Sequence, residues 1–306
     1  PPVRRHLLAE QRLSRTRSAA MVWTIERVAH MLAGVGYPMV LLKGATYIGQ
    51  DLPIAAGRLP SDLDILVPRA HLADAQQRLL KAGWMEVPLD AHDQRYYHEW
   101  SHEVPPMTHP LMALELDLHH NILPPLARTH VDADTLLATL SPSRWPGWQV
   151  LSPVDQVLHS AVHLFQDPEP VDRLRDLVDM DGLVRHFAAL QPDFHRQLGE
   201  RATALGLAPA LALCRHFTAS WLGTPWPDGM PGLPSLRLRA WRQVLHTLLW
   251  PTEPDDRPTL SKDAAAQLAL LRYHQGRLPM RLLLPHLWHK WRTQHTAAAE
   301  EPPPAG

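Results

Sequence analysis

The chain has 306 residues, of which 45% are hydrophobic and 20% are charged, and its 30 basic and 31 acidic side chains give a net charge of −1. This composition predicts a folded protein of one large domain or two ordinary ones. It disfavours a general nucleic-acid binder, because such proteins carry a basic excess. Cys214 is the only cysteine, and no run of roughly 18 apolar residues is present, so we expect a cytoplasmic protein without disulfides or transmembrane segments.

The first 125 residues alternate helical and strand-like patterns. Residues 1–35 are predicted to form an N-terminal helical segment packed on the core, because apolar side chains recur there at helical spacing. Residues 36–125 predict an α/β core with a mixed sheet. Its expected strands lie near 38–43, 62–67, 84–88, 95–104 and 111–120, with helices over 45–52 and 69–82.

Helical patterns dominate the second half of the chain. Residues 126–150 are expected to be a Pro-rich connection, and residues 151–296 an all-helical C-terminal domain that begins at a serine cap followed by proline, Ser152-Pro153. A disordered tail is expected over 297–306. The basic amphipathic stretch 277–292 is a candidate for peripheral contact with a membrane or an acidic partner, the alternative being a terminal helix packed on its own domain.

The strongest chemical signal lies at residues 61–67, Ser-Asp-Leu-Asp-Ile-Leu-Val. Side chains alternate along a strand, so Asp62 and Asp64 are expected to project from one face. Two adjacent carboxylates repel each other unless a cation lies between them, and Mg²⁺ is commonly held by one or two carboxylates together with substrate phosphates. The alternative is an exposed strand end with two solvated aspartates.

Segments before and after this pair add candidate ligands. Residues 39–45 end in Lys43-Gly44-Ala45, where a strand feeds a helix N-terminus that favours phosphate, and Arg58 follows shortly after. Residues 111–122 alternate strictly, which places Glu115, Asp117 and His119 on one face of a strand. This strand therefore supplies a third carboxylate for a metal site.

Several of these residues match a family pattern. Leu42-Lys43-Gly44, Arg58, the run Asp62–Val67 and Asp117-Leu118-His119-His120 resemble the bacterial, largely uncharacterised nucleotidyltransferase-like family of the DNA polymerase β-type superfamily. The resemblance covers about residues 20–292. Asp117 stands where that family has Glu, and His120 replaces its usual aromatic residue.

The resemblance implies roles for residues that the pattern groups into three sets. The catalytic and metal-binding set is Asp62, Asp64 and Asp117. The nucleotide- and phosphate-binding set is Lys43, Gly44, Ala45, Arg58 and Ser61. The acceptor-side candidates are His119, Glu115, His163 and Asp179. The implied cofactor is Mg²⁺ or Mn²⁺, and the implied substrate is ATP or another nucleoside triphosphate.

The function predicted on this basis is Mg²⁺-dependent transfer of a nucleotidyl group, most simply AMP from ATP, to a small-molecule or protein acceptor. The alternative is a catalytically silent nucleotide-binding or interaction module with the same fold. Ala45 favours the alternative, since well-studied members of the superfamily follow the turn glycine with serine, whereas three intact carboxylates favour the enzyme.

Overall fold

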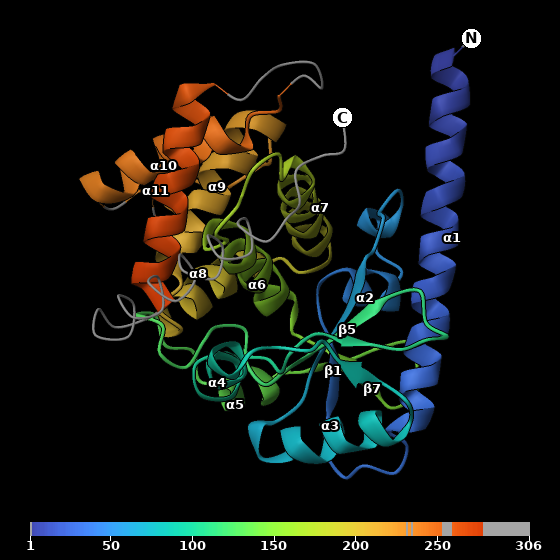
Figure 1. The fold of residues 1–306 in the computed structure, drawn as a ribbon. Coiled ribbons are helices and arrows are strands. Elements are labelled where there is room, and N and C mark those ends of the chain that lie inside the picture. Colours follow the sequence, from blue (N-terminus) through green and yellow to red (C-terminus); the bar gives the residue numbers. More distant parts are fainter. Residues whose placement is uncertain (1, 231, 234, 253–258, 278–306) are drawn as a thin grey trace, which may run out of the picture.

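The computed structural model describes residues 2–230, 232–233, 235–252 and 259–277. These residues form an α/β part built on one sheet and a helical part beside it (Figure 1). The predicted tail at 297–306 lies outside the described residues, as does the basic stretch from residue 278 onward. Among the helices described, none is both long and apolar enough to cross a membrane.

The sheet is mixed and has seven strands in the order β3-β4-β5-β2-β1-β7-β6. Its two central pairings differ, because β2 runs antiparallel to β1 and parallel to β5. The strands are β1 (Met39–Leu41), β2 (Asp62–Leu66), β3 (Met85–Glu86), β4 (Met107–Thr108), β5 (Glu115–His119), β6 (Ser141–Pro142) and β7 (Trp148–Val150).

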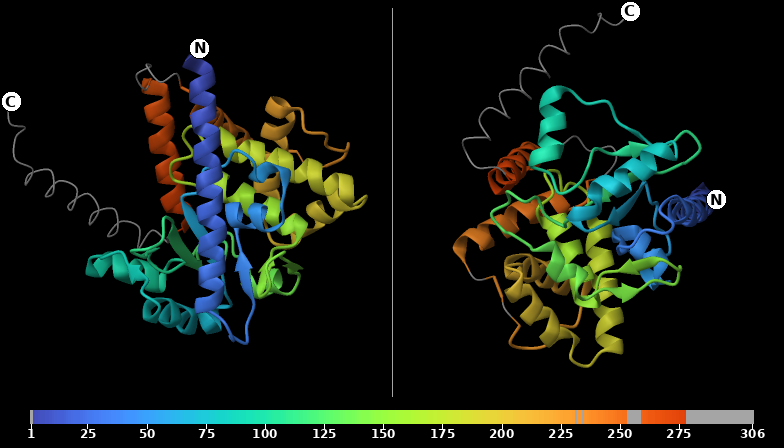
Figure 2. Two further views of the ribbon diagram at one scale, coloured as in Figure 1. Left: turned by 90° about the vertical axis from the view of Figure 1, so that its right-hand side faces the viewer. Right: turned by 90° about the horizontal axis from the view of Figure 1, so that it is seen from below.

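One face of the sheet packs against α1 (Pro2–Met31) and α3 (Leu72–Lys81). Side chains that alternate along the strands, among them Leu63, Ile65 and Leu116, are fully buried on this face. Buried positions in α1 begin at Ser14, and the residues before it are exposed. Seen from below, α1 runs nearly end-on at the margin of the molecule (Figure 2, right).

The opposite face of the sheet packs against the helical part. Val40, Leu42 and Leu66 lie in one hydrophobic cluster with residues of the helices that follow residue 152. Short elements complete the α/β part, namely α2 (Lys43–Gly49) and the 3₁₀ turns η1 (Pro53–Ala55) and η2 (Arg69–His71). The polar residues of β2 and β5 share this face, so the candidate site lies toward the helical part.

The helical part begins where the sequence predicts. The Ser152 side chain accepts a hydrogen bond from Asp155 N, and Pro153 occupies the first helical position. The helices are α6 (Pro153–Phe165), α7 (Leu174–Leu190), α8 (Phe194–Ala204), α9 (Ala208–Leu222), α10 (Leu236–Leu249) and α11 (Leu260–Arg277). The predicted fold class, an α/β core with a mixed sheet followed by a helical region, is confirmed.

Two segments differ from the sequence prediction. The expected strand at 95–104 is wrong over its first half, because α4 (Ala91–Glu99) forms there, capped by Asp90 and supported by the Arg95–Glu99 pair one turn apart. Residues 126–150 are more than a connection. They contain α5 (Ala133–Leu137) and strands β6 and β7, and β7 pairs in parallel with β1 inside the sheet.

Candidate functional site

The floor of the candidate site is formed by neighbouring positions of two parallel strands. Asp64 of β2 pairs in register with Asp117 of β5, and Asp62 pairs with Glu115. Directly opposed residues of adjacent strands have their side chains within contact range. Asp64 is 2% exposed, Asp62 and Asp117 are half-buried, and Glu115 is exposed. Pairing therefore brings Asp117 to the acidic pair, as the alternating pattern predicted.

Asp64 is held by two basic groups on the same carboxylate oxygen. Lys43 Nζ donates to Asp64 Oδ1 at 2.6 Å, and His119 Nε2 lies 3.0 Å from the same atom. The second ring nitrogen, His119 Nδ1, lies 3.2 Å from Glu103 Oε2. A ring with a carboxylate at each nitrogen donates at both when it is protonated, so Glu103, His119, Asp64 and Lys43 form a continuous chain of alternating charge.

The pKa values of Asp64, Lys43 and His119 are shifted in the direction that their charged partners favour and not in the direction that burial favours. Burial alone would raise the pKa of Asp64, but Lys43 and His119 hold it well below its ordinary value. Burial would likewise lower the pKa values of Lys43 and His119. Asp64 raises both, together with Glu103 in the case of His119. Asp64 is therefore kept ionised between two basic groups, and His119 is biased toward its protonated form.

The other two aspartates, Asp62 and Asp117, do not belong to this chain of alternating charges. Burial, followed by the charge of Asp64, raises the pKa of Asp117 to about 7. The same two causes raise the pKa of Asp62. Within the described residues, Asp117 has no hydrogen-bond partner, and Asp62 accepts one bond from the Ser61 hydroxyl, at 3.1 Å. Excess negative charge thus lies beside Asp64.

This arrangement suits a divalent cation. Ligand atoms of Asp64, Asp117 and His119 lie within 4.8 Å of one another, which is the range needed to share one ion. Because Lys43 and His119 both contact Oδ1 of Asp64, its Oδ2 atom is available for a metal, together with the carboxylate of Asp117. Asp62 lies on the same face of the sheet but outside this group. Hard cations such as Mg²⁺ prefer such oxygen ligands.

A cavity of about 310 Å³ opens beside the acidic pair, between the α/β part and the helical part. Its floor contains Asp62 and Asp64, and its walls come from the α2 turn, the segment before β2, α6 and α7. The lining residues with polar side chains are Lys43, Tyr47, Arg58, Ser61, Asp62, Asp64, Ser160, His163, Arg173, Asp176 and Asp179. The described structure thus has room for a small ligand at the predicted motif.

The far wall of this cavity is an ion-pair network. Arg58, from the segment before β2, pairs with Asp179 of α7, and its guanidinium lies 5.2 Å from the Tyr47 ring centroid. Arg175 donates to Asp179 at 3.0 Å and also to the carbonyl of Ile54. Asp179 is therefore a shared acceptor that joins α7 to the loop before β2.

The structure separates the predicted residues into two groups. Among the phosphate and acceptor candidates, Lys43, Gly44, Arg58, Ser61, His163 and Asp179 line the cavity. Ala45 is buried in the core on the opposite face of the sheet, and Glu115 faces solvent. His119 is 3% exposed and contacts the Asp64 carboxylate through its Nε2 atom. Asp117 lies beside Asp64 but outside the cavity lining.

Glu103 and Arg173 were not among the predicted site residues. Glu103 lies in the segment that was expected to form a strand at 95–104. In the structure it forms an isolated antiparallel β-bridge with His119. Arg173 bonds Asp176 within the cavity and Asp167 beyond it. Glu103 and His119 belong to separate segments that chain spacing does not connect, whereas Asp176 lies one helical turn after Arg173, so that pair has a local signal.

Comparisons with known proteins assign the chain to a family. The chain matches the model of a family described as uncharacterised nucleotidyltransferase over residues 1–223. No protein of curated function matches the chain. Among solved structures, that of JHP933 from Helicobacter pylori shares 15% sequence identity, with 84% of this chain and 97% of that chain covered and a TM-score of 0.36. Because the family model matches well over half of this chain, the chain belongs to this family of nucleotidyltransferases.

Proposed function

We propose that this protein is a Mg²⁺-dependent enzyme that transfers a nucleotidyl group, most simply AMP from ATP, to an acceptor hydroxyl or amine. The observation that carries the proposal is the register of β2 and β5, which sets Asp117 beside Asp64 and leaves Asp62 on the same face at the cavity floor. Three carboxylates so close together are costly for a protein that only binds or scaffolds, because their mutual repulsion lowers its stability.

The three aspartates have distinct places in this proposal. Asp64 and Asp62, at the cavity floor, would hold the metal that reaches the nucleotide, and Asp117 would complete the site on the side away from the cavity. Mn²⁺ would satisfy the same oxygen ligands. When bound, the metal supplies charge neutralisation for the triphosphate and for the acceptor oxygen. His119 and Lys43 fix the orientation of Asp64 through their contacts with Oδ1.

The basic wall of the cavity would contact the triphosphate. Lys43 is 21% exposed despite its bond to Asp64, so its ammonium can also face a phosphate oxygen. The Gly44 backbone adjoins it, and Arg58 lies next to Gly44, since a Cβ at that glycine would be 3.5 Å from Arg58 Nε. Arg58 would exchange part of its contact with Asp179 for the pyrophosphate leaving group. Ser61 would orient Asp62.

The acceptor would enter from the helical part. His163 of α6 lines the cavity, and its pKa lies well below the ordinary value because of burial and the charge of Lys43. A neutral imidazole can accept a hydrogen bond from an acceptor hydroxyl or amine and so orient it. Tyr47 and Ser160, whose hydroxyls lie 3.0 Å apart, form the adjacent wall. Asp179 would act indirectly, by positioning Arg58.

The decisive experiment measures turnover directly. The full chain is incubated with MgATP and a panel of small molecules and proteins, and pyrophosphate release is followed together with transfer of label from α-³²P-ATP. We expect pyrophosphate release that requires Mg²⁺ or Mn²⁺ and is abolished by Asp62→Asn. Asp74→Asn, which removes an exposed carboxylate from α3, serves as the control and should keep full activity.

A catalytically silent nucleotide-binding module is the second candidate, and one contact favours it. The Lys43 ammonium lies directly on Asp64, where it already neutralises part of the charge that a metal would otherwise neutralise. MgATP would then bind without pyrophosphate release, and Lys43→Met would not weaken binding of ATP more than binding of AMP. Greater loss for ATP than for AMP, together with label transfer, would favour the enzyme.

A further inference from the structure

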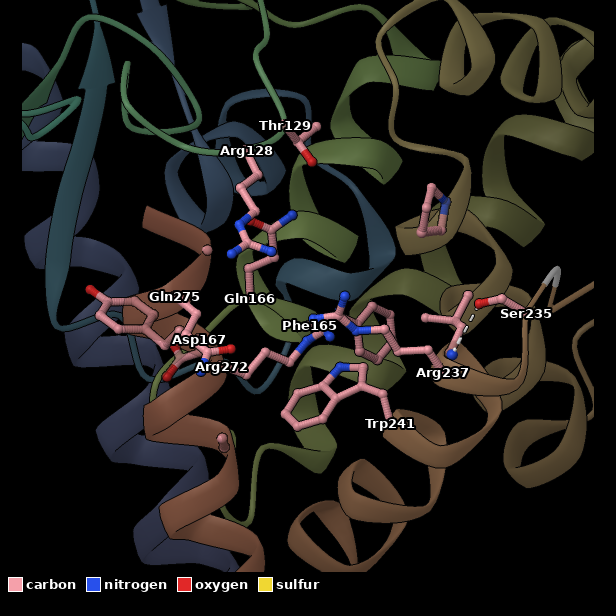
Figure 3. A pocket seen from close by; sticks show the side chains of 15 residues that line it. Arg128, Thr129, Phe165, Gln166, Asp167, Ser235, Arg237, Trp241, Arg272 and Gln275 are labelled. Atoms are coloured by element: carbon pink, nitrogen blue, oxygen red, sulfur yellow. Dashed lines mark hydrogen bonds between the residues drawn. The ribbon is translucent and has the colours of Figure 1, made fainter. Parts of the chain in front are cut away.

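A second cavity of about 310 Å³ lies within the helical part and shares no lining residue with the candidate active site. It is enclosed by the C-terminal end of α6, the start of α9, the N-terminal end of α10, the last turns of α11 and the loop at Arg128–Thr129 (Figure 3). Neither the family match nor the proposed nucleotide chemistry assigns a role to this cavity. We call it the arginine pocket.

Three arginines give the pocket its charge. The side chains of Arg128, Arg237 and Arg272 extend from three different elements toward one region (Figure 3). No carboxylate of the described chain forms an ion pair with any of them. Asp167, the sole acidic residue of the lining, is engaged by Arg173 at 3.1 Å. The pocket therefore carries uncompensated positive charge in a concave space, which attracts anions.

Trp241 provides an independent sign of a ligand. Its side chain is 7% exposed and lines the pocket, yet its Nε1–H has no acceptor among the described residues. Buried donors are nearly always satisfied, so an unsatisfied indole N–H in a pocket wall indicates a ligand or water at that position. The Arg272 guanidinium lies 4.6 Å from the Trp241 ring centroid, which keeps this arginine next to the free donor.

The N-terminal end of α10 also contributes positive potential. Ser235, Arg237 and Leu238 of its first turn line the pocket, and the Ser235 hydroxyl caps the helix by accepting from Leu238 N at 3.2 Å. The N-terminus of a 14-residue helix carries a partial positive charge. Phe165 and Leu238 add an apolar part to the wall.

We propose that the arginine pocket is a binding site for a small phosphate-bearing molecule, separate from the candidate active site. Guanidinium groups from three directions match the several oxygens of a phosphate group, and the Trp241 N–H supplies one further directed donor. The apolar wall suits an organic group attached to the phosphate. The Asp167–Arg173–Asp176 ion pairs connect this pocket to the cavity at the acidic pair.

The test is isothermal titration of the full chain in EDTA, at constant and low ionic strength, with inorganic pyrophosphate and with phenyl phosphate. We expect one binding event that Arg237→Gln weakens by about tenfold or more, the effect of losing one charge-assisted contact. Trp241→Phe keeps the ring and removes only the N–H, and should weaken binding by about threefold to tenfold. Tighter binding of phenyl phosphate would identify an organic phosphate as the ligand, and tighter binding of pyrophosphate an inorganic one.

Two control variants make the outcome unambiguous. Arg239→Gln removes the same charge from an exposed position of α10 outside the pocket, and should leave the affinity unchanged. Arg58→Gln removes an arginine from the candidate active site. EDTA withholds the metal that lets phosphate approach the aspartates there, so this variant should also leave the affinity unchanged. Absence of binding, equal losses in Arg237→Gln and Arg239→Gln, or a loss in Arg58→Gln alone would overturn the proposal. None of these results bears on nucleotidyl transfer at the aspartates.

Discussion

Asp62 and Asp64 are two residues apart and share a face, but their surroundings make them energetically different. Asp64 is the buried centre of a charge network in which Lys43 and His119 each rely on it as a partner. Asp62 is half-buried at the cavity floor, where its main electrostatic neighbour is the like charge of Asp64. Neutralising one of these carboxylates should therefore affect the fold, and neutralising the other should affect only the function.

We predict opposite stability effects for the two conservative variants. Asp64→Asn leaves the Lys43 ammonium without its compensating charge and should lower the free energy of unfolding by about 3 kcal/mol, as when one partner of a buried pair is removed. Asp62→Asn relieves repulsion and should leave stability unchanged or slightly higher. Urea denaturation of both variants measures this, and calorimetry should show that both have lost Mg²⁺-dependent ATP binding. Unchanged ATP affinity in both variants would contradict the assignment of the metal site.

Asp117 gives a pH signature with a definite sign. Its pKa is about 7 in the folded chain, well above that of an unfolded aspartate, so between about pH 4 and pH 7 the folded state holds a proton that the unfolded state has released. The Asp117 carboxyl therefore contributes stability at acidic pH that is lost as pH rises toward 7. Relative to Asp117→Asn, the free energy of unfolding of the natural chain should fall across this range.

Metal binding should reverse that fall. A divalent cation at Asp117 displaces the proton, so Mg²⁺ should restore stability at pH 8 and have little effect at pH 5. Denaturation series with Mg²⁺ and with EDTA, run on the natural chain and on Asp117→Asn, measure both effects. Parallel pH profiles for the two proteins would show that Asp117 is not the perturbed group.

At the scale of elements, the site depends on how α7 approaches η1. Gly182 of α7 faces Ile54 of η1 so closely that a methyl group at this glycine would overlap the Ile54 side chain. The same contact region holds the bonds from Arg175 to the carbonyls of Ile54 and Ala56. Close packing of this helix on this turn thereby sets the position of the loop that carries Arg58.

We therefore predict that Gly182→Ala destabilises the protein, although alanine favours a helix over glycine by about 1 kcal/mol. Overpacking at Ile54 should outweigh that gain and leave a net loss of about 1–2 kcal/mol. Gly199→Ala in α8 is the matched control, since a methyl group there meets only ordinary contacts with Met230, and it should stabilise. Adding Ile54→Ala to Gly182→Ala should recover part of the loss in a double-mutant cycle.

The elements that the sequence predicted well are those specified by local pattern. Alternation in β2 and β5 and the serine–proline start of α6 follow from rules that act over a few residues. The helix at α4 was missed because its aromatic and histidine content is typical of strands, while the Asp90 cap that starts it lies outside the segment assigned to the strand. Strands β6 and β7 are too short to show a periodic pattern, and only pairing with β1 defines their place in the sheet.

The candidate site shows the same contrast between features set by local pattern and features set by long-range contacts. Strand alternation predicted that Asp62 and Asp64 share one face and that Glu115, Asp117 and His119 share another, whereas the parallel pairing that brings the two sets together is seen only in the structure. The contacts of Arg58 with Asp179 and of His119 with Glu103 join residues from separate elements, and chain spacing carries no information on such partners. The arginine pocket is the extreme case, because its three arginines come from a loop and two helices that are far apart in sequence.

At the scale of the whole molecule, the α/β part and the helical part share their largest hydrophobic cluster. Val40, Leu42 and Leu66 of the sheet region pack with α6 in the same cluster as α7 to α11. Polar contacts follow the same boundary, including the hydrogen bond from Gln156 to Gln50, at 2.8 Å, and the Arg58–Asp179 pair. Separating the two parts would expose apolar surface and break buried ion pairs together.

We therefore expect the chain to unfold as one cooperative unit, although the candidate active site lies between its α/β part and its helical part. Differential scanning calorimetry should show one transition, because separating the parts would break the largest hydrophobic cluster, which they share. Saturating MgATP should raise the midpoint of the entire transition, as expected for a ligand bound between parts that unfold together. Asp179→Ala, which deprives Arg58 and Arg175 of their shared acceptor, should lower the midpoint, while Asp193→Ala, at an exposed pair of α8, should not. Two resolved transitions, only one of them moved by MgATP, would show that the parts fold separately and that the nucleotide contacts only one.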